Sequence, residues 1–311
     1  MIRLFWKEKN VLVTGSSGFI GHRLVQRLLE LDTNVTGIDI VKPEETNNDN
    51  FHFIQHDITK KMPSVDNIDI IFHLAAYPVP RYCEKNPTEA FRINVQGHHN
   101  VLKFVEENNV SKFLFTSSAF LYGNTPEYLP IDENHPIKPF DNVYSITKKI
   151  GEDLSRMLEE NSKTSVTILR LFNTFGERQS NDYLIPTIIE QAMSDKDVEL
   201  WSDKPAKDFN YIDNTVDAII LAGESSDSGI FNVGSGKRVK IKELTEYICS
   251  KFNKKMKFLD KEILGASEIE CNFNKIQTKL GWKPQVELFE GLERTIEWYK
   301  NNNSRRGYNI F

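Results

Sequence analysis

The sequence is poor in cysteine and has no long apolar run. Its three cysteines are far apart and odd in number: Cys83, Cys249 and Cys271. This spacing excludes a disulfide framework and a CxxC metal site, and it predicts reduced thiols. No stretch approaches the roughly 18 consecutive apolar residues of a membrane span, and the N-terminal residues lack the apolar core of a signal peptide. We therefore expect a cytoplasmic protein without membrane attachment.

An excess of positive charge is also missing. Lysine and arginine total 39 against 44 acidic residues, a formal net charge of −5. Broad binding to the phosphate backbone of nucleic acids needs a basic face, so this class of partner is excluded. The 311 residues, 39% of them hydrophobic, are enough for about two domains that need neither disulfide nor metal to hold a core.

The first half alternates between short apolar runs, which predict strands, and amphipathic stretches, which predict helices. The predicted strands are 10–14, 35–39, 51–54, 68–74, 112–116 and 165–170, and the predicted helices are 20–31, about 88–108 and 142–161. Strands without strict polar alternation, separated by helices, indicate a doubly wound parallel sheet covered on both faces. We expect an α/β protein with domains at 1–172 and 173–311, the second a smaller mixed α/β unit with isolated strands such as 229–233. A segment near 210–235 returns to the first domain, and the tail 304–311 carries no recognisable chemistry.

A glycine-rich turn lies where the first strand meets the first helix, with the sequence Thr14-Gly-Ser-Ser-Gly-Phe-Ile-Gly21. Gly15 permits a tight turn, Gly18 lets the backbone approach a pyrophosphate, and Gly21 allows the helix to pack closely on the strand. The N-terminus of the helix then presents free amides and the positive end of its dipole to phosphates. This context predicts a dinucleotide site of the Rossmann type.

The end of the second strand indicates which dinucleotide is bound. Asp39 stands near the distance downstream at which a carboxylate binds the ribose 2′-hydroxyl. A carboxylate there repels a 2′-phosphate, so NAD is favoured over NADP. The alternative is an aspartate that only starts a loop.

The sequence Tyr144-Ser-Ile-Thr-Lys148 places a phenol and an ammonium one helical turn apart on the same face. A neighbouring lysine favours the phenolate, so we predict a lowered pKa for Tyr144 and a usable base near neutral pH. Tyr247 and Lys251 have the same spacing, but they lie in a late amphipathic helix with no accompanying strand motif. The spacing alone is therefore weak evidence, and context decides.

The context favours the first pair. It follows the fifth strand and Ser117-Ser118, whose hydroxyls would lie at the carboxyl edge of the sheet, where open α/β folds bind ligands. The same helix has small residues below the pair, and its opposite face carries an apolar stripe made of Ile146, Ile150, Leu154 and Met157. Such a stripe needs a partner, either the protein's own core or a second subunit.

Further motifs follow in chain order: Asp57-Ile58, His73-Leu-Ala-Ala76, Asn94-Val-Gln-Gly97, Ser117-Ser-Ala119, Arg170-Leu-Phe-Asn173, Gly176-Glu-Arg-Gln179, Asp208-Phe-Asn-Tyr-Ile-Asp213, Asn232-Val-Gly-Ser-Gly236 and Leu280-Gly-Trp-Lys-Pro284. With the glycine turn and the Tyr144 motif, this series resembles the extended short-chain dehydrogenase/reductase family, and within it the nucleotide-sugar epimerase and dehydratase branch of UDP-glucose 4-epimerase-like proteins. The resemblance covers about residues 8–300.

The resemblance implies a Rossmann domain that binds NAD and a C-terminal domain that closes over a nucleotide sugar, with a UDP-sugar as the first expectation. It implies no metal. It implies that Tyr144 is the catalytic base, that Lys148 orients and acidifies it, and that Ser118 shares the proton of the substrate hydroxyl. The implied cofactor contacts are Gly15, Gly18, Phe19, Ile20, Gly21, Asp39, Asp57, Ile58, Leu74, Ala75, Ala76, Asn94, Tyr144, Lys148 and Phe172. The implied substrate contacts are Ser118, Tyr144, Lys207 and Asn173, the last at the diphosphate. In similar proteins the tyrosine-bearing helix and the long helix before it form a homodimer interface, which would cover the apolar stripe.

Departures from the family pattern favour a subclass. Dehydratases carry an Asp-Glu pair after the catalytic hydroxyl residue, and sugar-acid decarboxylases keep a glutamate there, but this chain has Ala119 and Phe120. Before the Asp-Phe/Tyr pair, where the family has an arginine, this chain has Lys207. Lysine offers a point charge, whereas arginine binds a phosphate through two N–H groups. A later arginine is missing from the segment Leu264-Gly-Ala-Ser-Glu268. Both changes are consistent with weaker binding of the substrate diphosphate or with an unusual substrate.

The leading hypothesis is a nucleotide-sugar 4-epimerase, which oxidises the sugar to a 4-keto intermediate and reduces it again on the other face. A dehydratase, decarboxylase or net reductase of the same family is the alternative, and a non-catalytic dinucleotide sensor is disfavoured because Tyr144 and Lys148 both remain. Neither His73 nor the pair His98-His99 is expected to carry chemistry: adjacent helical residues diverge by about 100° and cannot readily share a metal.

Overall fold

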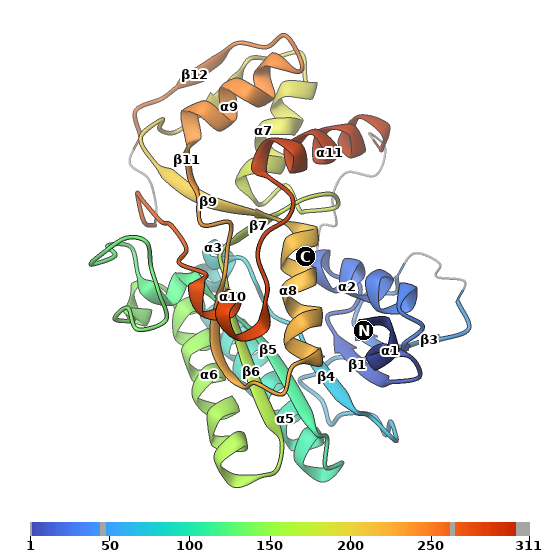
Figure 1. Cartoon of the computed structure of the whole chain (residues 1–311). Helices are drawn as coiled ribbons and strands as arrows, with labels where there is room; N and C mark the ends of the chain where they lie inside the picture. Colours follow the sequence, from blue (N-terminus) through green and yellow to red (C-terminus); the bar gives the residue numbers. More distant parts are fainter. Residues whose placement is uncertain (1, 44–47, 262–264, 303–311) are drawn as a thin grey trace.

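A seven-stranded parallel sheet forms the larger half of the molecule, with the strand order β10-β6-β5-β4-β1-β2-β3 (Figure 1). Every neighbouring pair in it is parallel. The strands are β1 (Asn10–Thr14), β2 (Asn34–Asp39), β3 (Phe51–Gln55), β4 (Ile70–His73), β5 (Lys112–Ser118), β6 (Ser165–Leu171) and β10 (Gly229–Val233). The order reverses between β1 and β4, and this reversal creates the crevice at which open α/β sheets bind ligands. The predicted fold class is confirmed.

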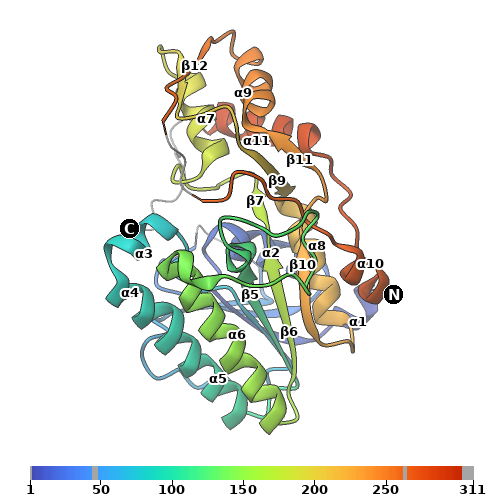
Figure 2. The same ribbon diagram turned by 90° about the vertical axis from the view of Figure 1, so that its left-hand side faces the viewer.

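This computed structural model describes residues 2–43, 48–261 and 265–302. Helices cover both faces of the large sheet: α2 (Phe19–Glu30) and α8 (Ile212–Glu224) pack together on one face, and α5 (His98–Glu107) and α6 (Val143–Asn161) on the other (Figure 2). The central strands are buried on both sides, as in β5, where all seven residues are buried. This burial explains their continuous apolar runs.

The helix predicted over 88–108 is interrupted. The structure has α4 (Pro87–Phe91), a π-helical segment η1 (Arg92–Gly97) and then α5. The prediction of one regular helix is wrong because η1 makes wider turns, and π-helical segments are frequent at functional sites. The short elements near it are α1 (Ile2–Trp6), α3 (Pro80–Lys85), η2 (Ala119–Tyr122) and η3 (Pro139–Asp141).

The smaller half is mixed. Strands β7 (Asn173–Phe175), β9 (Ala206–Tyr211) and β11 (Arg238–Lys240) form one sheet, and β8 (Val198–Leu200) pairs with β12 (Met256–Phe258). Around them lie α7 (Leu184–Met193), α9 (Ile241–Ser250) and α11 (Leu288–Asn301), whereas α10 (Asn274–Leu280) lies against β10 (Figure 1). The strand at 229–233 is not isolated: it is β10 of the large sheet, within the segment near 210–235 for which a return to the first domain was predicted.

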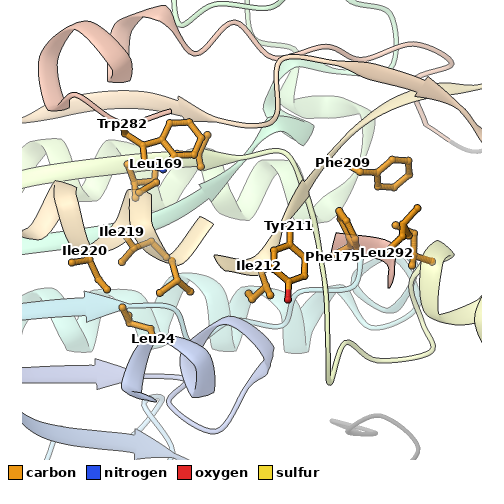
Figure 3. Packing of buried hydrophobic residues seen from close by; sticks show 14 of the residues in the cluster. Leu24, Leu169, Phe175, Phe209, Tyr211, Ile212, Ile219, Ile220, Trp282 and Leu292 are labelled. Atoms are coloured by element: carbon orange, nitrogen blue, oxygen red, sulfur yellow. The ribbon is translucent and has the colours of Figure 1, made fainter. Parts of the chain in front are cut away.

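One apolar core runs through both halves. Its cluster extends from Leu24 and Leu169 beside the large sheet, through α8, to Phe209 and Leu292 in the smaller half (Figure 3). The two halves are thus joined by shared packing as well as by crossing chain segments. Among the described residues no helix is long and apolar enough to cross a membrane. The predicted tail at 304–311 and Leu264 lie outside the described residues.

Candidate active site

The glycine turn connects β1 to α2 at the crevice, and its backbone leaves room only for glycine at two positions. Gly15 has φ +73°, and a Cβ there would lie 2.7 Å from the Ala75 nitrogen. A Cβ on Gly21 would lie 1.9 Å from the Gly15 oxygen. Gly18 is the N-cap residue of α2, whose first turn has neither a side-chain cap nor an acidic residue. The amides and positive dipole end of this helix therefore remain available to an anion such as a pyrophosphate.

Asp39 ends β2 beside this turn. Its Oδ2 accepts the Ser17 N–H at 3.0 Å and its Oδ1 accepts the Val41 N–H at 3.0 Å. Burial raises the pKa of Asp39, and these N–H bonds act against the rise. The carboxylate thus helps to shape the glycine turn, and each oxygen keeps a lone pair for a ribose hydroxyl. The donor set fits NAD: glycine backbone for the diphosphate and a carboxylate for the ribose.

The loops after β3 and β4 complete this rim of the crevice. Leu74, Ala75 and Ala76 directly follow β4, and the Ala75 N–H donates to Thr14 Oγ1 at 3.3 Å. Ile58 is buried in the core after β3, and Asp57 precedes it. Partial burial acts to raise the pKa of Asp57, but hydrogen bonds from Thr59 and Arg92 keep it below its usual range. Every predicted contact before Asn94 therefore lies at the carboxyl ends of β1 to β4.

Tyr144 and Lys148 lie one turn apart at the start of α6, with 8% and 4% of their surfaces exposed. Lys148 Nζ lies 5.7 Å from the centroid of the Tyr144 ring and donates to the Thr116 carbonyl at 2.8 Å. Tyr144 is hydrogen-bonded to Ser118, the last residue of β5. The structure thus brings the three predicted catalytic side chains together at the edge of the sheet.

Burial raises the pKa of the Tyr144 phenol, and the nearby Tyr183 and Cys83 add to the rise. The hydrogen bond from Ser118 acts in the opposite direction. The predicted lowering by Lys148 is therefore wrong for this structure, because loss of water around the phenol outweighs any effect of the ammonium. Burial also lowers the pKa of Lys148 to about 8.

Asn94 lies in the π-helical segment and supports helix α6. Its Oδ1 accepts the Tyr77 N–H at 2.6 Å, and its Nδ2 donates to the Tyr77 carbonyl at 3.2 Å and to Thr147 Oγ1 at 3.0 Å. Thr147 in turn donates to the Tyr144 carbonyl at 2.8 Å. Both amide donors of Asn94 are used, so its evident part is to position the turn that carries Tyr144.

A buried ion pair lies one turn further along α6 than Lys148. Glu152 on α6 binds Arg170 on β6 through two hydrogen bonds of 2.9 and 2.7 Å, and it accepts Ser117 Oγ at 2.6 Å. Arg170 also donates to Tyr122 Oη at 3.1 Å, and Tyr122 donates to Asn232 Oδ1 at 2.6 Å. This chain of bonds links α6, η2, β6 and β10 and holds the floor of the crevice.

The predicted substrate residues of the smaller half lie across the crevice on β7 and β9. Asn173 Nδ2 donates to the Asp208 carbonyl at 2.8 Å, and Lys207 donates to the Ala266 carbonyl. Burial lowers the pKa of Lys207 to about 8. The predicted cofactor contact Phe172 is buried with Ala119 in a separate cluster between the two halves.

Sequence reasoning missed residues that approach Tyr144 from the smaller half. Asp182 binds Arg81 and accepts Tyr82 Oη at 2.5 Å, which ties the turn before α7 to α3. Tyr183 follows, near Tyr144 and the buried thiol Cys83. These residues are about 100 positions apart in the chain and form no motif, so no local signal could have paired them.

The remaining candidates lie elsewhere. Tyr247 and Lys251, the second pair with this spacing, both bind Glu293 of α11, at 2.9 and 2.7 Å. His98 is buried and bonded to Ser155 Oγ at 3.0 Å, whereas His99 is exposed. The described residues include no cluster of three or more histidine, cysteine or acidic side chains able to hold a metal.

The family model described as the NAD dependent epimerase/dehydratase family matches residues 11–234. A Methanocaldococcus jannaschii protein provisionally named a UDP-glucose 4-epimerase is 31% identical over 94% of this chain and 99% of its own. A UDP-N-acetylglucosamine 4-epimerase from Methanobrevibacter ruminantium M1, solved with UDP-N-acetylmuramic acid, is 27% identical, with a TM-score of 0.89 over 95% of this chain and 99% of its own. MoeE5, solved with UDP-glucuronic acid and NAD, is 26% identical, with a TM-score of 0.86 over 94% and 99%.

The chain belongs to the NAD-dependent epimerase/dehydratase family. It is an enzyme of that family, and its cofactor is NAD. This membership agrees with the glycine turn, with Asp39 at the end of β2 and with the crevice at the strand reversal.

Proposed function

We propose that the chain is a nucleotide-sugar 4-epimerase that acts on a UDP-sugar. The observation that carries the proposal is the group formed by Tyr144, Ser118 and Lys148 at the edge of the sheet beside the glycine turn. The relatives named as 4-epimerases support it. Residues 1–172, with the return segment near 210–235, would form the cofactor half and residues 173–311 the substrate half.

The glycine turn would hold the diphosphate of NAD, and Asp39 its ribose. The other proposed cofactor contacts are Phe19, Ile20, Asp57, Ile58, Leu74, Ala75, Ala76 and Phe172. NAD, when bound, supplies a site that accepts hydride from the sugar and returns it. On the opposite side Asn173 and Lys207 would contact the sugar nucleotide, and Lys207 has two further N–H donors besides the one that binds Ala266.

The chain's own residues would handle the proton. Tyr144 takes the proton of the sugar 4-hydroxyl as the C4–H bond breaks, and Ser118 holds the hydroxyl oxygen beside it. The ammonium of Lys148, fixed by the Thr116 carbonyl, stabilises the phenolate that forms. The 4-keto sugar then rotates, and Tyr144 returns the proton after reduction on the other face. The sugar gains and loses the same two electrons, so no net oxidation occurs.

The residues after Ser118 argue against the other reactions of the family. Elimination of water needs a proton donor for the leaving hydroxide. Ala119 and Phe120 provide none, and the carboxylate nearest in sequence to this point, Glu127, forms an ion pair with Lys138. Dehydration and decarboxylation therefore remain alternatives that the residues after Ser118 do not favour.

The test is Tyr144→Phe, with Tyr247→Phe as a matched control from the second tyrosine–lysine pair. Tyr144→Phe should lower kcat on a UDP-hexose by about a thousandfold while changing the Kd for NAD by less than threefold, because the phenol oxygen alone is lost. Tyr247→Phe should leave both unchanged. NMR of the sugar products gives the readout. Unchanged turnover of Tyr144→Phe contradicts the assignment, and accumulation of a keto product or free NADH indicates a dehydratase or reductase.

We also propose that the enzyme is a homodimer. In α6 the stripe residues Ile146, Ile150 and Leu154 are half-buried, and Met157 is 54% exposed. Leu154 packs in part on the protein's own core. The remaining apolar surface would be covered by a second copy through α5 and α6.

A further inference from the structure

Phe120 is a large apolar side chain left partly exposed beside Tyr144. It is 39% exposed, whereas Ala119, Leu121 and Tyr122 in the same short helix η2 are buried. The centroids of the Phe120 and Tyr144 rings lie 6.0 Å apart, edge to face at 86°. The ring therefore lies beside the proposed catalytic phenol, where it would form an aromatic wall against a bound sugar.

Two hydrogen bonds fix the backbone of Phe120, one at its N–H and one at its carbonyl. Its N–H donates to Ser118 Oγ at 3.2 Å, and its carbonyl accepts Ser145 Oγ at 3.1 Å. The Ser145 N–H in turn donates to Oδ1 of Asn142, the N-cap residue of α6, at 2.8 Å. These bonds fix the position of the aromatic wall relative to Ser118 and Tyr144. A sugar hydroxyl bound by those two side chains would therefore place its neighbouring carbons against the ring.

The chemistry of this wall distinguishes neutral from charged substituents. An aromatic ring gains contact energy with C–H groups, but it offers no partner to a carboxylate, which would lose water without compensation. Of the nearby cations, Lys148 on α6 donates to the Thr116 carbonyl, and Arg81 on α3, which packs against α6, binds Asp182. Because the ring has no hydrogen-bond donors, it would contact either face of the 4-keto sugar equally well as the sugar rotates.

We propose that Phe120 is a specificity-determining residue that selects nucleotide sugars with uncharged substituents beside the reacting carbon and disfavours uronic acids. This inference rests on the proposed epimerase function and adds the substrate class to it. The charged group is excluded by lack of a partner, and the neutral sugar is favoured by apolar contact.

The experiment compares kcat/KM for UDP-glucose and UDP-glucuronic acid. The wild type should favour UDP-glucose by about tenfold or more, as expected when a charged group finds no partner. Phe120→Ala should reduce this preference by about tenfold, chiefly through a lower kcat/KM on UDP-glucose. Phe120→Leu keeps an apolar wall and should retain most of the preference.

Phe289→Ala is the matched control, because Phe289 is 37% exposed and its ring also packs on a tyrosine, Tyr247, with centroids 4.6 Å apart. It should leave both kcat/KM values unchanged. A wild type that favours the uronic acid, or a Phe120→Ala variant with an unchanged ratio, overturns the proposal.

A binding measurement separates this outcome from failure of the epimerase function. The Kd of each nucleotide sugar is measured by calorimetry on Tyr144→Phe with and without Phe120→Ala, where no turnover is needed. If Phe120→Ala lowers the preference for binding UDP-glucose about tenfold, the proposed role of Phe120 is supported even if no epimerisation is found. An unchanged ratio refutes it even if epimerisation is confirmed.

Discussion

Asp39 has an observed part in shaping the glycine turn and a proposed part in binding the cofactor. Its oxygens accept the N–H groups of Ser17 and Val41, so the side chain that would bind the ribose also fixes the glycine turn. A substitution that removes only the charge of Asp39 can therefore be compared with one that also removes its hydrogen bonds.

We expect Asp39→Asn and Asp39→Ala to differ. Asp39→Asn keeps one acceptor oxygen and removes the charge that repels a 2′-phosphate, so the preference for NAD over NADP should fall about tenfold. Asp39→Ala should in addition weaken NAD binding about tenfold or more, because the turn loses both bonds. Titration with each dinucleotide measures both effects. An unchanged preference in both variants would count against the ribose contact.

We expect Lys148 to give the activity a dependence on pH. Burial lowers the pKa of its ammonium to about 8, so the charge is present below pH 8 and is lost as the pH rises through that value. Because the charge is needed to stabilise the Tyr144 phenolate, kcat/KM should fall above about pH 8. Lys148→Met should lower kcat/KM about a hundredfold and remove this limb of the profile. A wild-type profile that stays flat to pH 10 would rule out this role.

At the scale of elements, the contact of α6 with β6 depends on the buried pair Glu152 and Arg170, with exposures of 2% and 5%. Glu152→Gln leaves Arg170 as a buried charge without its partner and should lower the free energy of unfolding by about 3–5 kcal/mol.

The matched control lies on the same helix. Asp153→Asn removes the exposed ion pair with Lys149 and should cost about 0.5 kcal/mol or less. Urea denaturation of both variants gives the comparison. Equal losses would show that the buried pair is no more important than a surface one.

The elements also show what a sequence can predict. The strands of the large sheet were predictable because each is a short apolar run between polar loops, and β1, β2 and β6 lie within a residue or two of the prediction. The π-helical segment was not predictable, since its apolar residues also fit an ordinary helix. Asn94 in this segment bonds to Tyr77, a contact between separate parts of the chain that no local pattern reveals.

The same limit applies to the site. Local spacing found the glycine turn and the pair Tyr144 and Lys148, because each motif lies within one turn or helix. It did not find Asp182 or Tyr183, which reach the site only through the packing of the turn before α7 on α3. It also predicted the wrong direction for the pKa of Tyr144, since burial depends on the whole fold.

At the scale of the whole molecule, the continuous core joins the cofactor half to the smaller half, and the stripe on α6 faces outward. We expect a dimer at micromolar concentration in analytical ultracentrifugation. Ile150→Lys should convert it to a monomer, because a charge would be placed in the apolar contact. Leu4→Lys, at an 80% exposed apolar residue outside the stripe, serves as the control and should leave the dimer intact. A monomeric wild type would refute the proposed interface.

The central claim is that a sugar is oxidised and reduced again at one carbon within a single site. A UDP-hexose carrying deuterium at C4 tests it most directly, with the products followed by NMR and the absorbance of NADH recorded. We predict an epimer mixture that retains the deuterium at C4 with no accumulation of NADH. Loss of the label to solvent, or NADH formed in step with product, would contradict the account.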